Sequence, residues 1–135
     1  MARNYIHQDE ATEQETLFTW SAVQSVTHPE LELMFHVPNG GKRTKSEAAR
    51  LKRQGVKAGV PDIFLPVPRG RYNGLWIELK SGRNTATSKQ KEWIKRLREQ
   101  GYAAEVCVGW ECAVMAIETY LDIRPRTRIQ NKSSL

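Results

Sequence analysis

Hydrophobic and polar residues repeat with two different periods along the chain, and the changes of period divide it into helices and strands. Apolar residues at helical spacing predict helices over Thr12–Val26, Thr44–Gln54, Thr87–Gln100 and Glu111–Leu121. The first three of these runs begin with a Thr-x-x-Glu/Gln capping pattern. Alternation, or a short run of β-prone residues, predicts strands over Leu31–Val37, Gly59–Leu65, Leu75–Lys80 and Tyr102–Val108. This order of elements indicates an α/β or α+β domain.

The first predicted helix carries an acidic residue on the face that we expect to be buried. That face consists of Phe18, Ala22 and Val26. Glu15 lies three residues before Phe18 and so points the same way, although it also completes the capping pattern Thr12-x-x-Glu15 and could serve only there. Glu13 falls with Leu17 on the side that we expect to face outward.

Acidic residues interrupt two apolar runs in the middle of the chain. Burial of a carboxylate is costly unless the group is paired or binds a metal. If the runs Gly59–Leu65 and Leu75–Lys80 pair across the loop Val67–Gly74, side-chain alternation brings Asp62 and Glu78 together, with Lys80 on the same face as Glu78. Two carboxylates can hold Mg²⁺ or Mn²⁺, and a neighbouring lysine can orient water or stabilise charge on a phosphate. The alternative is a surface Glu78–Lys80 ion pair and a capping Asp62.

Composition excludes several classes of protein. The 135 residues suit one domain, and 39% hydrophobic with 27% charged residues is ordinary for a soluble globular protein. No apolar run approaches the roughly 20 residues of a membrane span, and the N-terminus has no signal-peptide pattern. Cys107 and Cys112 form neither a disulfide framework nor a structural zinc site, so we expect reduced core thiols in a cytoplasmic protein.

Basic residues gather around the proposed acidic site. The net charge is +6, which is compatible with a polyanionic partner but is weak evidence alone. Cations cluster between residues 42 and 57, in the loop at Arg69 and Arg71, and between residues 89 and 98, where solvated helix faces are an equal alternative. We predict an N-terminal extension at 1–11, one domain at 12–122 and a flexible basic tail at 123–135.

The acidic motifs and their flanks resemble a known nuclease family. Pro61-Asp62 followed by Glu78-Leu79-Lys80 resembles the PD-(D/E)xK signature. The further motifs are Asn39-Gly40-Gly41-Lys42-Arg43, the run Gly55–Asp62, and Ser88-Lys89-Gln90 with Trp93 and Leu97. Together they are similar to the VRR-NUC branch of that superfamily, and especially to its small stand-alone members in phages and prophages. The resemblance covers about Glu13 to Leu121.

This resemblance implies both a fold and an active site. The fold is an α/β, restriction-endonuclease-like core of order α-β-β-β-α-β, with a small mixed sheet flanked by helices, one inserted helix and one added at the end. The implied metal ligands for Mg²⁺ or Mn²⁺ are Asp62, Glu78 and the backbone carbonyl of Leu79, completed by Glu15, with Glu13 as the alternative. Lys80 would position the attacking water. Gln90 would join the active site, unless it only caps its helix. His36 is expected to be structural or to support the ligands.

The resemblance also implies a substrate. Stand-alone members look like homodimeric endonucleases that act on branched DNA, which predicts a Holliday-junction resolvase; a flap or duplex endonuclease and a non-catalytic DNA-binding module are the alternatives. The expected DNA-binding residues are Asn39, Lys42, Arg43, Arg50, Arg53, Lys57, Arg69 and Arg71. We expect no membrane and no nucleotide cofactor, and a bacterial or phage-infected cytoplasm. Candidate dimer contacts are Trp20, Trp76 and Trp110.

Overall fold

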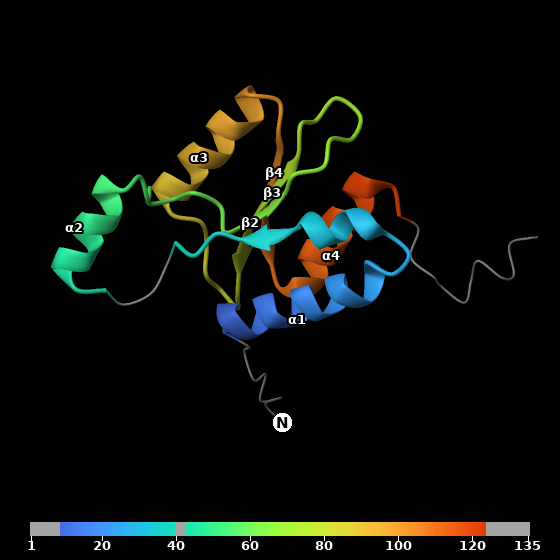
Figure 1. The fold of residues 1–135 in the computed structure, drawn as a ribbon, viewed down its shortest axis with the longest axis horizontal. Coiled ribbons are helices and arrows are strands. Elements are labelled where there is room, and N and C mark those ends of the chain that lie inside the picture. Colours follow the sequence, from blue (N-terminus) through green and yellow to red (C-terminus); the bar gives the residue numbers. More distant parts are fainter. Residues whose placement is uncertain (1–8, 40–42, 124–135) are drawn as a thin grey trace, which may run out of the picture.

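A computed structural model describes residues 9–39 and 43–123, which build a small mixed sheet between helices (Figure 1). The helices are α1 (Glu10–Gln24), the short 3-10 helix η1 (Pro29–Leu33), α2 (Lys45–Arg53), α3 (Ser88–Glu99) and α4 (Trp110–Leu121). The strands are β1 (Phe35–His36), β2 (Ile63–Leu65), β3 (Leu75–Lys80) and β4 (Ala103–Val108), in the spatial order β1-β2-β3-β4. The first two pairings are antiparallel, and β3–β4 is parallel. None of the described helices is long and apolar enough to cross a membrane. The α/β fold with a mixed sheet is confirmed.

The two faces of the sheet are covered by different helices. α1 and α4 lie on one face and α3 on the other, as Figure 1 shows. Alternation along β2 and β3 sends Ile63 and Ile77 into the core beneath α1 and α4, where each is about 1% exposed or less. On the opposite face, Phe64 stacks on Trp76 with ring centroids 4.1 Å apart. Phe64 and Trp76 are directly opposite in the register of β2 and β3, so this stacked pair packs across the two strands.

The face that α1 buries differs from the predicted one. The helix begins at Glu10, capped by Asp9, whose Oδ1 accepts from the Thr12 N–H at 2.8 Å, so the predicted cap at Thr12 is wrong. Leu17 is 0% exposed and Ser21 is also buried, whereas Val26 is 83% exposed and lies beyond the helix. Of the predicted inward face, Phe18 packs against the core, but Ala22 and Val26 are exposed, so the centre of that face is wrong. The polar Ser21 concealed the true stripe, since its hydroxyl donates to the Leu31 carbonyl within the core.

The predicted strand over Leu31–Val37 is largely wrong. Pro29 begins η1, and β1 keeps only Phe35 and His36. Leu31 and Met34 are both buried, and a spacing of three residues suits one side of a helical turn rather than one face of a strand. Beyond β1, the Val37 N–H donates to the Asp62 carbonyl at 2.7 Å and keeps this segment beside β2.

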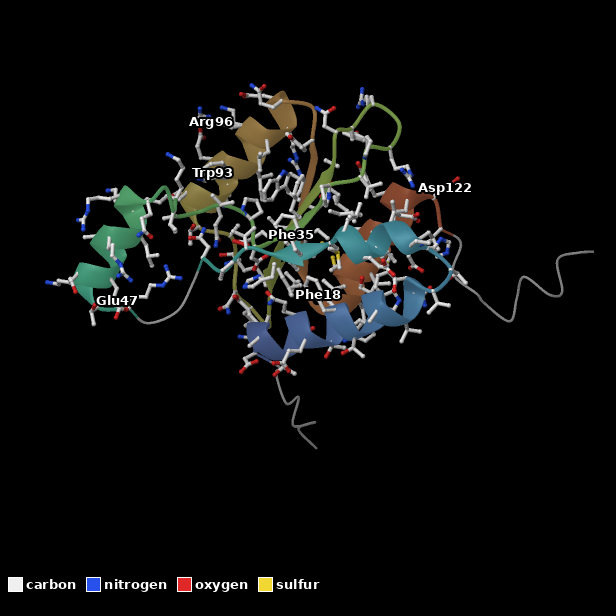
Figure 2. All side chains as sticks on the ribbon, viewed as in Figure 1. Phe18, Phe35, Glu47, Trp93, Arg96 and Asp122 are labelled. Atoms are coloured by element: carbon white, nitrogen blue, oxygen red, sulfur yellow. The ribbon has the colours of Figure 1, made fainter. Side chains whose placement is uncertain are left out.

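The remaining predicted helices are confirmed, and α2 is the unusual one. Thr44 caps it by accepting from the Glu47 N–H at 3.2 Å, and Gly55, with φ +102°, follows its end. None of its residues is buried. α2 projects from the body, with Glu47 well away from the sheet (Figure 2). Because no residue of α2 belongs to the core, we expect its residues to be selected for what they contact at the surface.

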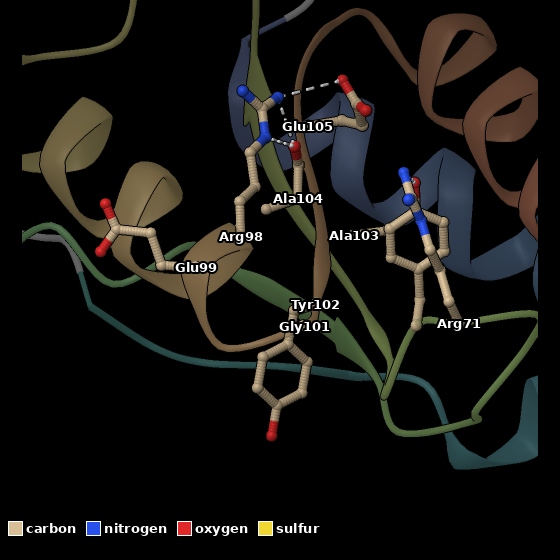
Figure 3. A pocket seen from close by; sticks show the side chains of 9 residues that line it. Arg71, Arg98, Glu99, Gly101, Tyr102, Ala103, Ala104 and Glu105 are labelled. Atoms are coloured by element: carbon tan, nitrogen blue, oxygen red, sulfur yellow. Dashed lines mark hydrogen bonds and ion pairs between the residues drawn. The ribbon is translucent and has the colours of Figure 1, made fainter.

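β4 forms one edge of the sheet, and an arginine covers part of that edge. Ala103 and Gly109 donate their N–H groups toward β3, so alternation points the backbone groups of Ala104, Val106 and Val108 outward. The Arg98 guanidinium donates to the Ala104 carbonyl at 2.7 and 3.0 Å and lies 3.6 Å from the Glu105 carboxylate (Figure 3). The backbone N–H and carbonyl groups of Val106 and Val108 lie farther along this edge, beyond the part that the Arg98 side chain covers.

Several predicted surface and core positions need correction. Cys107 is a buried free thiol as expected, and burial raises its pKa, but Cys112 is exposed on α4 rather than in the core. Trp20 and Trp110 pack against the core, so neither is the exposed apolar contact that we expected for a dimer. The predicted basic tail lies almost entirely outside the described residues, as do most of the predicted extension and Lys42.

Candidate active site

A cavity of about 260 Å³ opens where β3 ends, beside the first turns of α1 and α3. It is lined by Glu10, Ala11, Gln14, His36, Asn39, Gly59, Val60, Asp62, Glu78, Lys80 and Gln90. Asp62, Glu78, Lys80 and Gln90, which were expected to form the site, thus come together from three separate segments of the chain.

The pairing of β2 with β3 brings the two carboxylates together. The register sets Ile63 opposite Ile77, and one further step places Asp62 opposite Glu78 on the same face. Glu78 is only 3% exposed and Lys80 8%. The Lys80 Nζ lies 4.0 Å from Glu78 Oε1, which is an ion pair at its outer limit. A solvated surface ion pair, the alternative weighed from the sequence, does not fit this burial.

Burial and mutual repulsion oppose the ionisation of the two carboxyl groups. Burial raises the pKa of Asp62, although the Leu79 N–H donates to its Oδ1 at 3.0 Å and acts in the opposite direction. Burial, and then the charge of Asp62, raise the pKa of Glu78 to about 8, and Lys80 offsets only part of this. At neutral pH the pair therefore retains a proton unless a cation neutralises it.

A hard divalent cation fits this set of oxygen donors. Within residues 9–39 and 43–123, no third Asp, Glu, His or Cys joins the two carboxylates as a metal-binding group. A further oxygen is available from the backbone, because the sheet register continued by one more pair places Leu79 opposite Pro61. Pro61 has no N–H and so cannot donate to the Leu79 carbonyl. The N–H and the carbonyl of Leu79 point to the same side of β3, and since the N–H donates to Asp62, the carbonyl also points toward Asp62. Carboxylate and carbonyl oxygens suit Mg²⁺ or Mn²⁺.

The structure redistributes the roles expected along α1. Glu15 is exposed and does not line the cavity, so the expectation that it points into the site is wrong. Glu13 instead accepts from the Trp110 N–H at 2.7 Å and satisfies the first turn of α4. Gln14 and Glu10 line the cavity and were missed. The signal was the helical spacing of Gln14 with Leu17 and Ser21, which is visible once the buried face is assigned correctly.

Gln90 and the residues around Asp62 hold the cavity wall in place. Gln90 Oε1 accepts from the Thr87 N–H at 2.8 Å while Thr87 Oγ1 accepts from the Gln90 N–H at 3.2 Å, so Gln90 caps α3 and lines the cavity at once.

His36 Nδ1 lies 2.9 Å from the Asp62 carbonyl, consistent with the structural role expected for it. Asn39 Nδ2 donates to the carbonyls of Lys57 and Val60 at 2.8 and 3.3 Å, which braces the loop before β2.

The basic residues expected to bind DNA occupy three places. Arg43 and Lys57 line a second, larger groove between α2 and α3. Arg50 and Arg53 are exposed on α2 and do not line that groove. Arg69 and Arg71 precede β3, whereas the acidic cavity opens at the other end of this strand, which is about 17 Å long at roughly 3.3 Å per residue. Those two arginines therefore do not border the acidic site.

Comparisons with known proteins agree with this arrangement. A family model described as the VRR-NUC domain matches residues 6–110. A solved structure described as a VRR_NUC domain protein has a TM-score of 0.75 and 35% sequence identity, over 87% of this chain and 92% of that one. No curated protein matches. The stretch matched by the family model contains Asp62, Glu78, Lys80 and Gln90.

Proposed function

Because the chain belongs to the VRR-NUC family, a nuclease-type domain that acts on DNA, we propose that it is a metal-dependent endodeoxyribonuclease. The observation that carries the proposal is the buried pair Asp62 and Glu78 beside Lys80, two carboxyl groups with raised pKa values in a cavity open to a substrate. Such a pair is costly for folding, and catalysis with a divalent cation supplies a reason to retain it.

The residues of the cavity divide the work of phosphodiester hydrolysis. Asp62, Glu78 and the Leu79 carbonyl would hold Mg²⁺ or Mn²⁺, which when bound lowers the pKa of water and neutralises phosphate charge. The Lys80 ammonium would donate hydrogen bonds to the attacking water and to the phosphate oxygen that gains charge. The Gln90 side chain, fixed by the cap of α3, would orient the same phosphate. Gln14 and Glu10, in place of Glu15, complete the wall on the α1 side.

The substrate that we propose is a four-way DNA junction in a bacterial or phage-infected cytoplasm, cut by a homodimer. Resolution of a junction needs paired cuts, and a two-fold axis supplies two sites. The surface that favours a second copy is the β4 edge, where Val106 and Val108 are 37% and 50% exposed, beside Met115 at 68%. Antiparallel pairing of Val106 with Val108 of a second copy would satisfy the outward backbone groups and leave the Arg98 cover intact.

Cleavage of three labelled DNAs of matched sequence tests this proposal: a four-way junction, a flap and a plain duplex, each with Mg²⁺, Mn²⁺ or EDTA. Paired symmetric nicks in the junction alone are the expected result. Cutting of the flap or duplex would retain a nuclease and reject the resolvase. A folded protein that binds DNA but cuts none of the three with either metal would indicate a non-catalytic DNA-binding module.

A further inference from the structure

The largest unassigned feature of the described surface beside the active site is a groove of about 660 Å³ between α2 and α3. Its lining residues are Asn39, Arg43, Ala48, Leu51, Lys52, Val56, Lys57, Ala58, Lys89, Glu92 and Trp93. Four of these are cations and one is an acid, and apolar side chains such as Leu51, Val56 and Trp93 line the groove with them. Trp93 lies on the α2 side of α3 (Figure 2). A lining that combines cations with apolar side chains suits a phosphodiester chain, which has charged phosphates and apolar sugar or base faces.

The groove and the catalytic cavity share a wall. Asn39 lines both, and in the loop before β2 Ala58 faces the groove while the next residue, Gly59, faces the cavity. A chain lying in the groove would therefore lead directly to the carboxylates.

Specific contacts hold this wall in a fixed position. The Trp93 Nε1–H donates to the Ala58 carbonyl at 3.1 Å, and Asn39 braces the loop from the other side. Gly59 has φ +93°, and a Cβ there would lie 2.9 Å from the backbone carbon of Lys89, so the loop is packed closely on α3. The groove is therefore a constructed feature rather than a chance gap beside a projecting helix.

The two sides of α2 have different surroundings although both are basic. Ala48, Leu51 and Lys52, at spacings of three and four residues, line the groove. Arg50 and Arg53, which the family resemblance led us to expect on DNA, are exposed as well but do not line the groove, so the strand path proposed below leaves them out. Because no residue of α2 is buried, loss of charge on either side leaves the core untouched.

We propose that this groove binds the sugar–phosphate backbone of the DNA strand that enters the active site, with Lys52 and Lys89 on its phosphates from opposite sides. Arg43 and Lys57 add contacts along the same path, and Trp93 and Leu51 lie against the sugars or bases. The proposal rests on the nuclease function proposed above and adds the route of the substrate strand.

A pair of charge-matched double variants tests the groove. Lys52→Ala/Lys89→Ala removes two cations from it, and Arg50→Ala/Arg53→Ala removes two cations from α2 outside it. Binding of a labelled four-way junction is measured by fluorescence anisotropy in EDTA, from about 50 to 200 mM salt, a range over which phosphate contacts lose affinity strongly. The groove variant should bind the junction at least about 10-fold more weakly than wild type. The magnitude of its slope of log K against log salt should fall by about 2, roughly 1 for each phosphate contact that is lost. The control should lose less than about 3-fold, and Lys52→Arg/Lys89→Arg should restore binding.

Equal losses in the two double variants, or no loss in the groove variant, would overturn the proposal, since charge alone or another surface would then explain binding. Circular dichroism melting confirms that both variants fold. The measurement needs no cleavage, so the two proposals fail separately. If Lys52→Ala/Lys89→Ala weakens DNA binding but the wild-type protein does not cut DNA with either metal, the nuclease proposal is rejected. If the wild-type protein cuts DNA but the double variant binds DNA as well as wild type, the proposed strand path is rejected.

Discussion

Replacement of Glu78 by glutamine should stabilise the metal-free protein and abolish its activity. The pKa of Glu78 rises from 4.5 to about 8 because the carboxyl group is buried beside Asp62. Each pKa unit corresponds to about 1.4 kcal/mol, so ionised Glu78 costs the fold on the order of 4 kcal/mol at pH 8. Glutamine keeps the size and removes the charge. We expect a gain of about 2–4 kcal/mol, or roughly 7–14 °C in Tm, for Glu78→Gln in EDTA at pH 8.

The dependence on pH gives the sign of this effect. Both carboxyl groups have folded pKa values above their unfolded values, so the folded chain holds more protons than the unfolded chain between about pH 4.5 and pH 8. The stability of the wild-type protein in EDTA should therefore fall as the pH rises through this window. The difference between wild type and Glu78→Gln isolates the coupled Asp62–Glu78 pair from the other titrating groups, and it should be near zero at pH 4.5 and largest at pH 8.

Thermal melts in EDTA at a series of pH values measure both quantities. Saturating Mg²⁺ or Mn²⁺ should raise the Tm of the wild-type protein at pH 8 and have a much smaller effect on Glu78→Gln. The reasoning would be refuted by a variant that is less stable than wild type in EDTA at pH 8. Wild-type stability that rises between pH 5 and pH 8, measured against the variant, would refute it equally.

Four further substitutions test the fold that supports the site. Leu17→Ala should cost about 2–5 kcal/mol in urea unfolding and Val26→Ala less than about 0.5, and the reverse order would restore the helix face predicted from the sequence. Gly59→Ala should cost about 1–3 kcal/mol and slow DNA cleavage, because its φ of +93° and the close Lys89 backbone both oppose a Cβ; an unchanged unfolding midpoint would show that the loop yields. Thr87→Ala should cost about 1 kcal/mol through loss of the α3 cap, and a midpoint equal to wild type would contradict the capping box.

The central cluster could be predicted from the sequence because its geometry is local. Period-two alternation and one hairpin loop are enough to place Asp62 beside Glu78 and Lys80 on the same face, and the structure brings all three together. The cap of α3 was visible for the same reason, since Thr87 and Gln90 are three residues apart and need no distant partner.

Features that depend on distant packing could not be predicted. Ser21 is buried with its hydroxyl donating to the Leu31 carbonyl, a distant partner, and its polarity in the sequence therefore pointed to the wrong face of α1. That error moved the expected site residue to Glu15 and concealed Gln14. The groove was hidden too, because the sequence gives Lys52 and Arg53 the same charge, and only the position of α3 separates them.

The most direct test of the proposed active site is single-turnover cleavage of labelled DNA as a function of Mn²⁺ concentration, for wild type, Asp62→Asn, Lys80→Ala and Glu15→Gln. Wild type should cut with a rate that rises with Mn²⁺ and vanishes in EDTA. Asp62→Asn and Lys80→Ala should lose about 10²–10³-fold or more in rate. Glu15→Gln removes a carboxylate from the exposed side of α1 and should cut like wild type. Cleavage that survives in EDTA or in Asp62→Asn, from protein free of contaminating nuclease, would contradict a metal-dependent site at these carboxylates.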